Sequence, residues 1–191
     1  PAIRQALDLL CTARLCHRVR ATDGAGVPLA AGIRERVFKV ILLDTGLVSA
    51  LLGLSLQMVD SLREIYRVNE GALAEQAVGQ ALRTIEPRFT APALFYWSRE
   101  RKGSAAELDY LLQHAGQVVP VEVKAGTTGT LKSLHLFMAK RTLPLGVRFS
   151  PHPPSLVDVD TKTTTGLVAK YRLLSLPPYM AGQIHRMLGS L

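Results

Sequence analysis

The feature that most constrains this chain is the stretch 107–124, which reads ELDYLLQHAGQVVPVEVK. It contains two runs rich in aliphatic and β-branched residues, separated by a short segment centred on Ala115 and Gly116. Such runs favour strands, and a glycine-containing break of this length is typical of a hairpin turn. The sequence therefore predicts an antiparallel strand pair at the centre of the fold.

This hairpin would bring ionisable residues together. With a turn centred between Ala115 and Gly116, Asp109 lies directly across from Glu122, and directly opposed residues point to the same face of a sheet. Lys124 follows Glu122 by two positions and returns to that face, where Glu107 would be its cross-strand partner. We therefore expect three or four charged groups to converge on one face.

The neighbours of these groups are almost all aliphatic. Two carboxylates held together in such surroundings repel one another and lose hydration, so they need a cation to stay ionised. A divalent metal such as Mg²⁺, which binds a few carboxylate oxygens together with waters, is one answer. The ammonium group of Lys124 is the other, and the residues alone leave both open.

The bulk composition indicates a globular protein with a preference for polyanions. The 191 residues fit one large or two small domains, and 48% of them are hydrophobic. The net charge of +8 and the isoelectric point near 9.9 favour nucleic acid as a partner, although many basic proteins bind none. The sequence leaves the oligomeric state open.

Other features predict a cytoplasmic location. No apolar run reaches the length of a bilayer span, and no secretion signal is apparent, so we expect no membrane association. Cys11 and Cys16 have neither the spacing nor the histidine partners of a zinc site, which predicts free thiols in a reducing compartment. The first residue is Pro1, which suggests a piece of a longer protein.

The N-terminal third alternates between helical and extended patterns. We expect Asp44 to cap a short apolar helix, which is a commoner role for such an aspartate than catalysis. The expected elements are a helix over 1–15, a ragged hairpin over 16–33, a strand over 38–43, and helices over 47–54 and 55–68.

The next helix carries a carboxylate in an unexpected place. Asn69 is a candidate N-cap for a helix that runs from Glu70 to about Ile85. Glu75 falls on its apolar stripe. A glutamate at the edge of a stripe that pairs with a lysine is commoner than a ligand, but both readings stand.

The remainder completes a mixed α/β pattern. From residue 69 to residue 150 the expected order is helix, strand, strand, strand, helix, strand. After the first helix, the expected elements are an aromatic strand over 94–98, a basic loop over 99–105, the hairpin, a helix over 131–141, strands over 145–149 and 167–174, and a last helix after Pro178.

These motifs resemble a known family. An acidic residue on a helix, Asp on one strand and Glu-x-Lys on the next resemble the PD-(D/E)XK nuclease superfamily, and the chain more closely resembles the DUF4143 family. The motifs that carry the closer resemblance are Gly71-x-x-x-Glu75, Phe95-Tyr96-Trp97, Glu107-Leu108-Asp109-Tyr110, Val121-Glu122-Val123-Lys124-Ala125-Gly126, Ser133-Leu134 and the upstream run from Val40 to Leu47.

The resemblance implies a fold and a context. It implies an α/β, restriction-endonuclease-like core (αβββαβ) with a mixed sheet over 69–191. The preceding 1–68 would hold a winged-helix-like remnant and a helical connector. The DUF4143 region commonly ends prokaryotic AAA-type ATPases, so the resemblance implies a P-loop ATPase module upstream, which would be the part that binds ATP.

The resemblance also implies roles for individual residues. Asp109, Glu122 and the Val123 carbonyl would bind Mg²⁺ or Mn²⁺, with Glu75 completing the shell through water. Lys124 would orient the attacking water and offset charge that develops on the phosphate. Leu108 replaces the proline that names the superfamily, but that position supplies no ligand.

Three functional hypotheses follow. The first is a metal-dependent deoxyribonuclease whose cleft is lined by the basic residues Arg99, Arg101, Lys102 and Lys132. The second is a non-catalytic DNA- or protein-binding module that regulates an attached ATPase and uses the same carboxylates as an ion-pair network around Lys124. The third is DNA binding by the N-terminal helix through Arg4, Arg14, Arg18 and Arg20, against which stands a simple solvated face.

Overall fold

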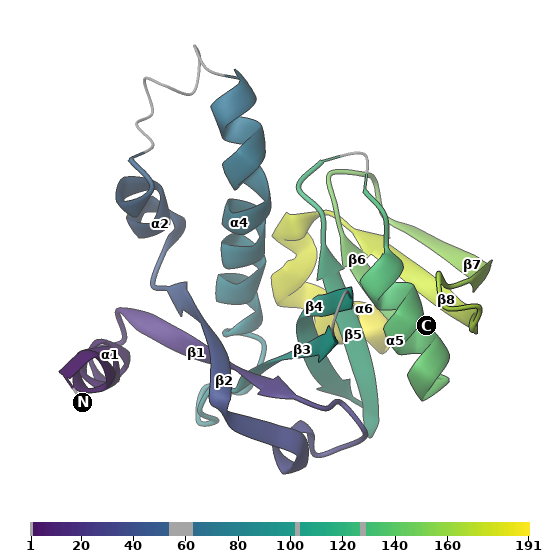
Figure 1. Cartoon of the computed structure of the whole chain (residues 1–191), viewed down its shortest axis with the longest axis horizontal. Helices are drawn as coiled ribbons and strands as arrows, with labels where there is room; N and C mark the ends of the chain where they lie inside the picture. The colour runs from purple at the N-terminus through teal and green to yellow at the C-terminus, as the bar shows by residue number, and fades with distance from the viewer. Residues whose placement is uncertain (1, 54–62, 102–103, 127–128) are drawn as a thin grey trace.

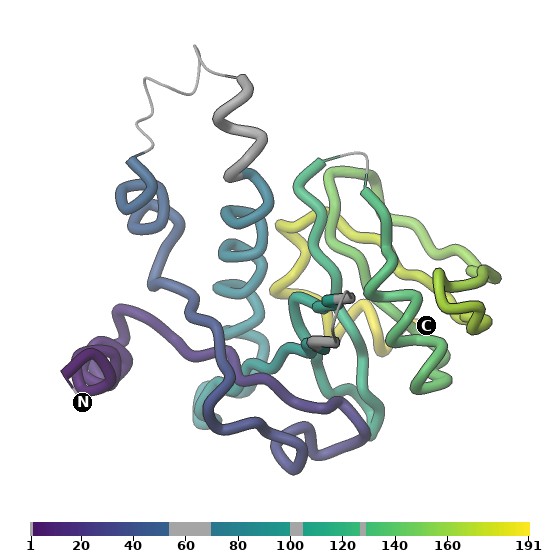
Figure 2. Tube along the Cα trace, viewed as in Figure 1, coloured from purple at the N-terminus to yellow at the C-terminus, as the bar shows by residue number. Residues whose placement is uncertain are grey.

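The chain folds around one mixed β-sheet with helices on both faces (Figure 1). The structure is a computed structural model that describes residues 2–53, 63–101, 104–126 and 129–191. Of residues 63–69, 100–101 and 104 it describes the backbone. Figure 2 follows the same path as a tube, from α1 at the N-terminus to the C-terminal end after α6.

Eight strands, five α-helices and two 3₁₀ helices make up the described part. The strands are β1 (Cys16–Thr22), β2 (Ile33–Leu42), β3 (Leu94–Arg101), β4 (Ser104–His114), β5 (Gln117–Val123), β6 (Leu145–Phe149), β7 (Ser155–Lys162) and β8 (Val168–Leu176). The helices are α1 (Ala2–Thr12), α2 (Thr45–Leu51), α4 (Arg63–Leu82), α5 (Lys132–Arg141) and α6 (Ile184–Leu188), with the 3₁₀ helices η1 (Leu29–Gly32) and η2 (Pro178–Gln183).

The strands form a single sheet in the order β2-β1-β3-β4-β5-β6-β8-β7. Four of the pairings are antiparallel, whereas β1–β3, β5–β6 and β6–β8 are parallel. From α4 to β6 the order is helix, strand, strand, strand, helix, strand, as the sequence predicts. The N-terminal strands β1 and β2 join this same sheet, and the division into 1–68 and 69–191 stays a prediction.

Each face of the sheet has its own core. On one face, α4, η2 and α6 cover a cluster that includes Tyr96, Tyr110, Val121 and Val123. On the other face, α5 covers a cluster that includes Leu108, Leu111 and Trp97. We call these the α4 face and the α5 face. The central strands β4 and β5 are therefore buried from both sides, which explains their nearly continuous apolar sequence.

The hairpin turn forms where the sequence places it. Ala115 and Gly116 both have positive φ, at 47° and 76°, which is the conformation of the tight turns that match strand twist. The register runs from His114 opposite Gln117 to Tyr110 opposite Val121, as predicted.

The pairing register between β3 and β4 shifts within β4. Opposite β3, Leu111 pairs with Phe95 but Leu108 pairs with Trp97, so β4 has one extra residue between these two pairs. That β-bulge falls on Asp109 and Tyr110. A bulge re-aims the side chains beside it, so strict alternation along β4, which the sequence analysis assumed, is wrong here.

The helix α4 lies unusually close to the sheet. A Cβ atom added at Gly79 would lie 2.3 Å from the Tyr110 hydroxyl oxygen, so only glycine fits this position. The Tyr110 hydroxyl donates a 2.8 Å hydrogen bond to the backbone carbonyl of Glu75, one turn earlier on the helix. This contact fixes the height of Glu75 above the sheet.

Several expected boundaries need correction. Helix α4 already includes Asn69, so Asn69 is no N-cap, and the helix ends at Leu82, before Ile85. The separate strands expected around residues 29–33 and 38–43 are one strand, β2, preceded by η1. Strand β7 lies in a segment for which the sequence analysis predicted no element. The segment 54–62, most of the helix expected over 55–68, lies outside the described residues.

Other expectations are confirmed. The Asp44 side chain caps α2 by accepting a 2.9 Å hydrogen bond from the Leu47 N–H. Helix α1, helix α5 and strand β6 occur within a few residues of their predicted bounds. No helix in the described part of the chain is long and apolar enough to cross a membrane.

Candidate functional site

Asp109 lies in the bulge of β4, and its side chain reaches toward the neighbouring central strand, β5. Its Oδ2 atom accepts a 2.6 Å hydrogen bond from the backbone N–H of Val123 on β5. An extra residue in β4 lets the carboxylate reach the backbone of the neighbouring strand in place of a regular ladder contact. The bulge thus holds Asp109 in a fixed position beside the end of β5.

Glu122 is the most buried carboxylate among the described residues, with its side chain 7% exposed. Its neighbours Val121 and Val123 belong to the core of the α4 face, so Glu122 points toward the α5 face. Its Oε1 atom lies 2.6 Å from Lys124 Nζ. Its Oε2 atom is buried and has no hydrogen-bond partner in the described part of the chain.

Lys124 has a different partner from the one expected. Strand β5 ends at Val123, and the Lys124 backbone N–H donates a 2.8 Å hydrogen bond to the Phe149 carbonyl on β6. The side chain bends back to Glu122, two residues earlier, and the expected pairing with Glu107 does not form. The cause is geometrical, because Lys124 has left the hairpin ladder.

Lys39 is a site residue that the sequence analysis missed. It comes from β2, and its ammonium group forms an ion pair with Glu75 on α4. The same group lies 3.5 Å from Glu107 Oε1. The rings of Tyr96 and Tyr110 flank it, with centroids 4.9 and 5.0 Å from Nζ. One cation therefore joins two acidic residues. The pairing of Glu75 with a lysine was one of the two readings that the sequence left open, whereas Glu107 was expected to pair with Lys124.

A signal for Lys39 was present in the sequence. It stands between Phe38 and Val40 in an apolar strand, and in the β1–β2 register it pairs with Val19, a residue of the α4-face core. A lysine that faces a core needs an anionic partner. Which anion it takes depends on contacts between distant parts of the chain, which local pattern does not reveal.

The carboxylates perturb one another. Burial, together with the negative charges of Glu122 and Glu75, raises the pKa of Asp109 from 3.8 to about 7. The Val123 hydrogen bond and the charge of Lys39 oppose this increase. Burial also raises the pKa of Glu122, although Lys124 lowers it through their hydrogen bond and charge. The site is therefore short of positive charge at Asp109.

The candidate residues divide into two groups across the sheet. Glu75, Glu107 and Lys39 form one group on the α4 face, and Glu122 with Lys124 forms the other. Asp109 feels charges from both. Within the described residues, no three carboxylate, imidazole or thiolate groups lie close enough to hold a metal ion.

The predicted basic lining is seen only in part. Lys132 is exposed at the first turn of α5, where it lines a cavity of about 420 Å³ with Arg148 and Lys162. Arg99 is half-buried on β3. Lys102 and the Arg101 side chain lie outside the described residues. The nucleic-acid roles of these four residues stay predictions.

Comparison with protein families agrees with the resemblance. Residues 70–164 match the family model described as Domain of unknown function (DUF4143). The match supports the resemblance of this segment to the DUF4143 family. No curated protein and no solved structure matches the chain.

The DUF4143 match includes most of the candidate site. The segment 70–164 contains Glu75, Glu107, Asp109, Glu122 and Lys124, together with the strands that position them. Lys39 lies outside it, on a strand that joins the same sheet from the N-terminal side. The matched segment thus takes one of its cations from an element that precedes it.

Proposed function

We propose that this DUF4143 segment is a restriction-endonuclease-like, PD-(D/E)XK core that hydrolyses phosphodiester bonds in DNA with a divalent metal. The observation that carries the proposal is the electrostatic interaction of Asp109 with Glu122. Burial raises the pKa of both carboxyl groups, and the negative charge of Glu122 contributes to the increase at Asp109. One Glu122 oxygen is buried and has no hydrogen-bond partner in the described part of the chain. A divalent cation would relieve both costs.

Two carboxylates, those of Asp109 and Glu122, are enough to hold Mg²⁺ or Mn²⁺. Mg²⁺ is commonly held by one or two carboxylates, with waters and substrate phosphate oxygens filling the other positions. Asp109 and Glu122 supply that pair, and the Val123 carbonyl is the proposed third protein ligand. Glu75 already forms an ion pair with Lys39, so we propose that it contacts the metal only through a water molecule. A bound metal would supply Lewis-acid stabilisation and an activated water.

The chain's own residues would divide the remaining work. The Val123 N–H orients Asp109, which leaves its other oxygen for the site. Lys124, with its side chain 29% exposed, is a cation beside Glu122 that solvent reaches. On binding of DNA, its ammonium group would turn toward the scissile phosphate and offset the charge that develops there. Lys39 holds Glu75 in place through their ion pair.

Positive charge on the α5 face supports a DNA substrate. Lys132, Arg148 and Lys162 line the same cavity as the uncapped start of α5, and none of the described residues that line it is acidic. A helix N-terminus and lysines are common ligands of backbone phosphates. Gly129, which also lines this cavity, lies against the Lys124 side chain, so the cavity adjoins the proposed catalytic group.

The wider context of the proposal follows from the family. The segment would be the C-terminal part of a prokaryotic, cytoplasmic AAA-type ATP-binding protein, with the ATPase module upstream and ATP bound only there. The winged-helix-like character of residues 1–68 belongs to the same proposal. Contact between this region and the core is extensive, since β1 pairs with β3.

A second candidate function has its own support. The ion pairs Lys39–Glu75 and Lys124–Glu122 neutralise most of the acidic groups, and no three metal-binding groups meet among the described residues. Such a network suits a non-catalytic module that binds DNA or protein and regulates the ATPase. In that case the acidic residues stabilise the fold and take no part in hydrolysis.

Cleavage of labelled DNA in the presence of Mg²⁺ or Mn²⁺ separates the two functions. The proposal expects cleavage by the wild type and loss of at least about a hundredfold in Asp109→Ala and Lys124→Ala. Lys170→Ala, which removes an exposed lysine on β8, is the matched control and should cleave normally. Absence of metal-dependent cleavage by the wild type, with DNA binding retained, favours the module.

A further inference from the structure

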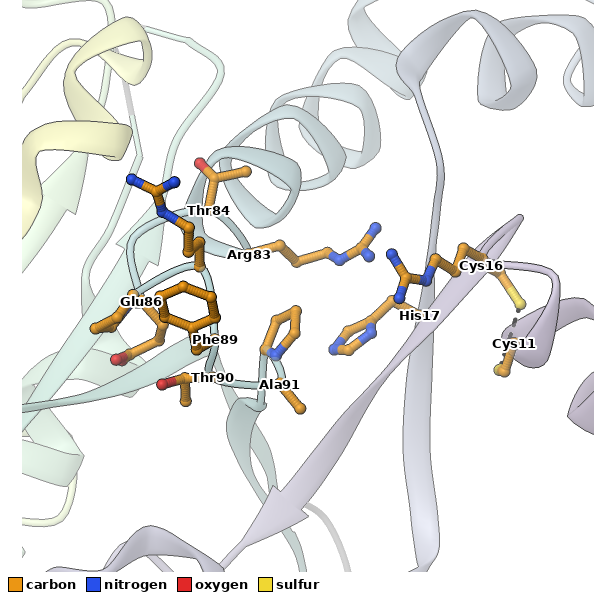
Figure 3. A pocket seen from close by; sticks show the side chains of 13 residues that line it. Cys11, Cys16, His17, Arg83, Thr84, Glu86, Phe89, Thr90 and Ala91 are labelled. Carbon is orange, nitrogen blue, oxygen red and sulfur yellow. Dashed lines mark hydrogen bonds between the residues drawn. The ribbon is translucent and has the colours of Figure 1, made fainter.

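A second basic pocket lies away from the carboxylates, between the N-terminal elements and the loop after α4 (Figure 3). Its volume is about 900 Å³. Three arginines line it: Arg14 after α1, Arg83 at the end of α4, and Arg88 in the following loop. Arg83 follows Glu75 by eight positions, about 12 Å along the helix axis, so this pocket is distinct from the carboxylate site.

Positive charge in this pocket is poorly compensated. None of the three arginines forms an ion pair with a described residue. Glu86 is the only acidic residue in the described lining, and its Oε1 atom lies 3.8 Å from His185 Nε2. The pocket therefore has a net positive charge that an anion would stabilise.

The surroundings of His17 show the same excess of positive charge. Figure 3 shows the Arg83 and His17 side chains pointing toward one another. Arg83 Nε and His17 Nε2 are buried, and neither has a hydrogen-bond partner in the described part of the chain. Burial, together with the charges of Arg83 and Arg20, lowers the pKa of His17 to about 4. The imidazole is thus neutral at pH 7, and a bound anion would favour its protonation.

The rest of the lining suits a ligand larger than a phosphate ion. Phe89 is 94% exposed, and the Arg88 guanidinium lies 5.7 Å from its ring centroid. Pro87, Ala91 and Pro92 add apolar surface, and Thr84 and Thr90 add hydroxyl groups. A volume of this size is typical of a small-molecule site, and an exposed aromatic ring beside arginines is typical of sites that stack bases.

We propose that this pocket binds a nucleotide, with its phosphate between Arg14 and Arg83 near His17 and its base against Phe89. The nucleotide is either free or part of a single strand, since both present the same phosphate and base. The proposal does not depend on phosphodiester hydrolysis at Asp109 and Glu122.

The test is a binding titration of the full chain with four probes: adenosine monophosphate, adenosine, inorganic phosphate and a short single-stranded oligodeoxynucleotide. Binding of the monophosphate should be at least about tenfold tighter than that of adenosine, because charge-assisted hydrogen bonds hold the phosphate. Arg83→Gln should weaken it at least about tenfold, and Phe89→Ala about fivefold or more. Arg172→Gln, an exposed arginine on β8, is the matched control.

Imidazole NMR adds a readout that a general charge effect would not give. The bound monophosphate should raise the pKa of His17 and leave that of the half-buried loop residue His152 unchanged. Tighter binding of the oligonucleotide, with the same dependence on Arg83, identifies the ligand as part of a strand, and tighter binding of the monophosphate identifies it as free. No binding of either, unchanged binding in folded Arg83→Gln, or phosphate and adenosine binding as tightly as the monophosphate would overturn the proposal.

Discussion

The backbone N–H of Val123 donates a 2.6 Å hydrogen bond to Asp109 Oδ2, which ties a carboxylate on one central strand to the backbone of the next. The bond forms because a bulge in β4 turns Asp109 out of the regular ladder. It also places Asp109 near Glu122 in surroundings where both carboxylates lose hydration. Most of what we expect of this protein follows from that placement.

Asp109 should make the stability of the fold depend on pH. Its pKa rises from 3.8 to about 7 on folding, so the folded protein holds this proton more tightly than the unfolded chain. Stability from this group is complete below pH 4 and is lost as pH rises toward 7. In Asp109→Asn we expect the decrease in unfolding free energy between pH 4 and pH 8 to be smaller by about 1–3 kcal/mol. Urea unfolding across this pH range measures it, and an identical decrease in both proteins would contradict the placement.

Lys39 should stabilise the α4 face of the site. Its removal in Lys39→Gln leaves Glu75 beside other carboxylates without a cation, so we expect a loss of about 1–3 kcal/mol in unfolding free energy. Lys170→Gln breaks an exposed pair with Asp160 and should cost less than about 0.5 kcal/mol. The double variant Lys39→Gln/Glu75→Gln should recover part of the loss. Equal effects of the two lysine substitutions would show that Lys39 has no special role.

Two glycines of α4 should respond in opposite directions. Gly79→Ala places a methyl group 2.3 Å from the Tyr110 hydroxyl oxygen and should destabilise the protein by about 1–3 kcal/mol. Gly71→Ala, on the same helix with open space around its Cβ position, should stabilise it by about 0.5–1 kcal/mol. Thermal unfolding of both variants tests this contact. Stabilisation by both substitutions would mean that α4 does not lie against Tyr110.

The Asp109 carboxylate should be needed for the site but not for the stability of the fold. In Asp109→Ala the Val123 N–H loses its acceptor, and the repulsion between Asp109 and Glu122 disappears with it. We expect the two effects largely to offset one another, with a net change within about 1 kcal/mol. Circular dichroism with urea unfolding measures it. A loss above about 4 kcal/mol would mean that Asp109 is mainly structural.

Much of the central fold could be predicted from the sequence because its signals are local. The turn at Ala115 and Gly116 fixes the hairpin register, and the alternation of apolar residues predicts α5 and β6. The sequence analysis did not predict strand β7, because its exposed residues and the prolines before it resemble a loop. It forms through its pairing with β8 at the edge of the sheet, which is a tertiary contact.

The site was harder to predict than the fold. Asp109, Glu122 and Lys124 stand out as charges in apolar strands, but the bulge that re-aims Asp109 has no local signal in the sequence. Lys39 reaches Glu75 only after β2 joins the sheet beside β1 and α4 covers it. Ion-pair partners that come from distant segments depend on this assembly, so Lys39 was missed and Glu107 was paired with the wrong lysine.

Calorimetric titration of the full chain with Mn²⁺ tests the central claim most directly. If Asp109 and Glu122 together form a cation site, the wild type should bind one ion, and Asp109→Asn and Glu122→Gln should each weaken binding at least about tenfold. Glu107→Gln, which removes an acidic residue paired with Lys39, should bind as the wild type does. Binding that is unchanged in Asp109→Asn and Glu122→Gln, or absent from the wild type, would contradict the account.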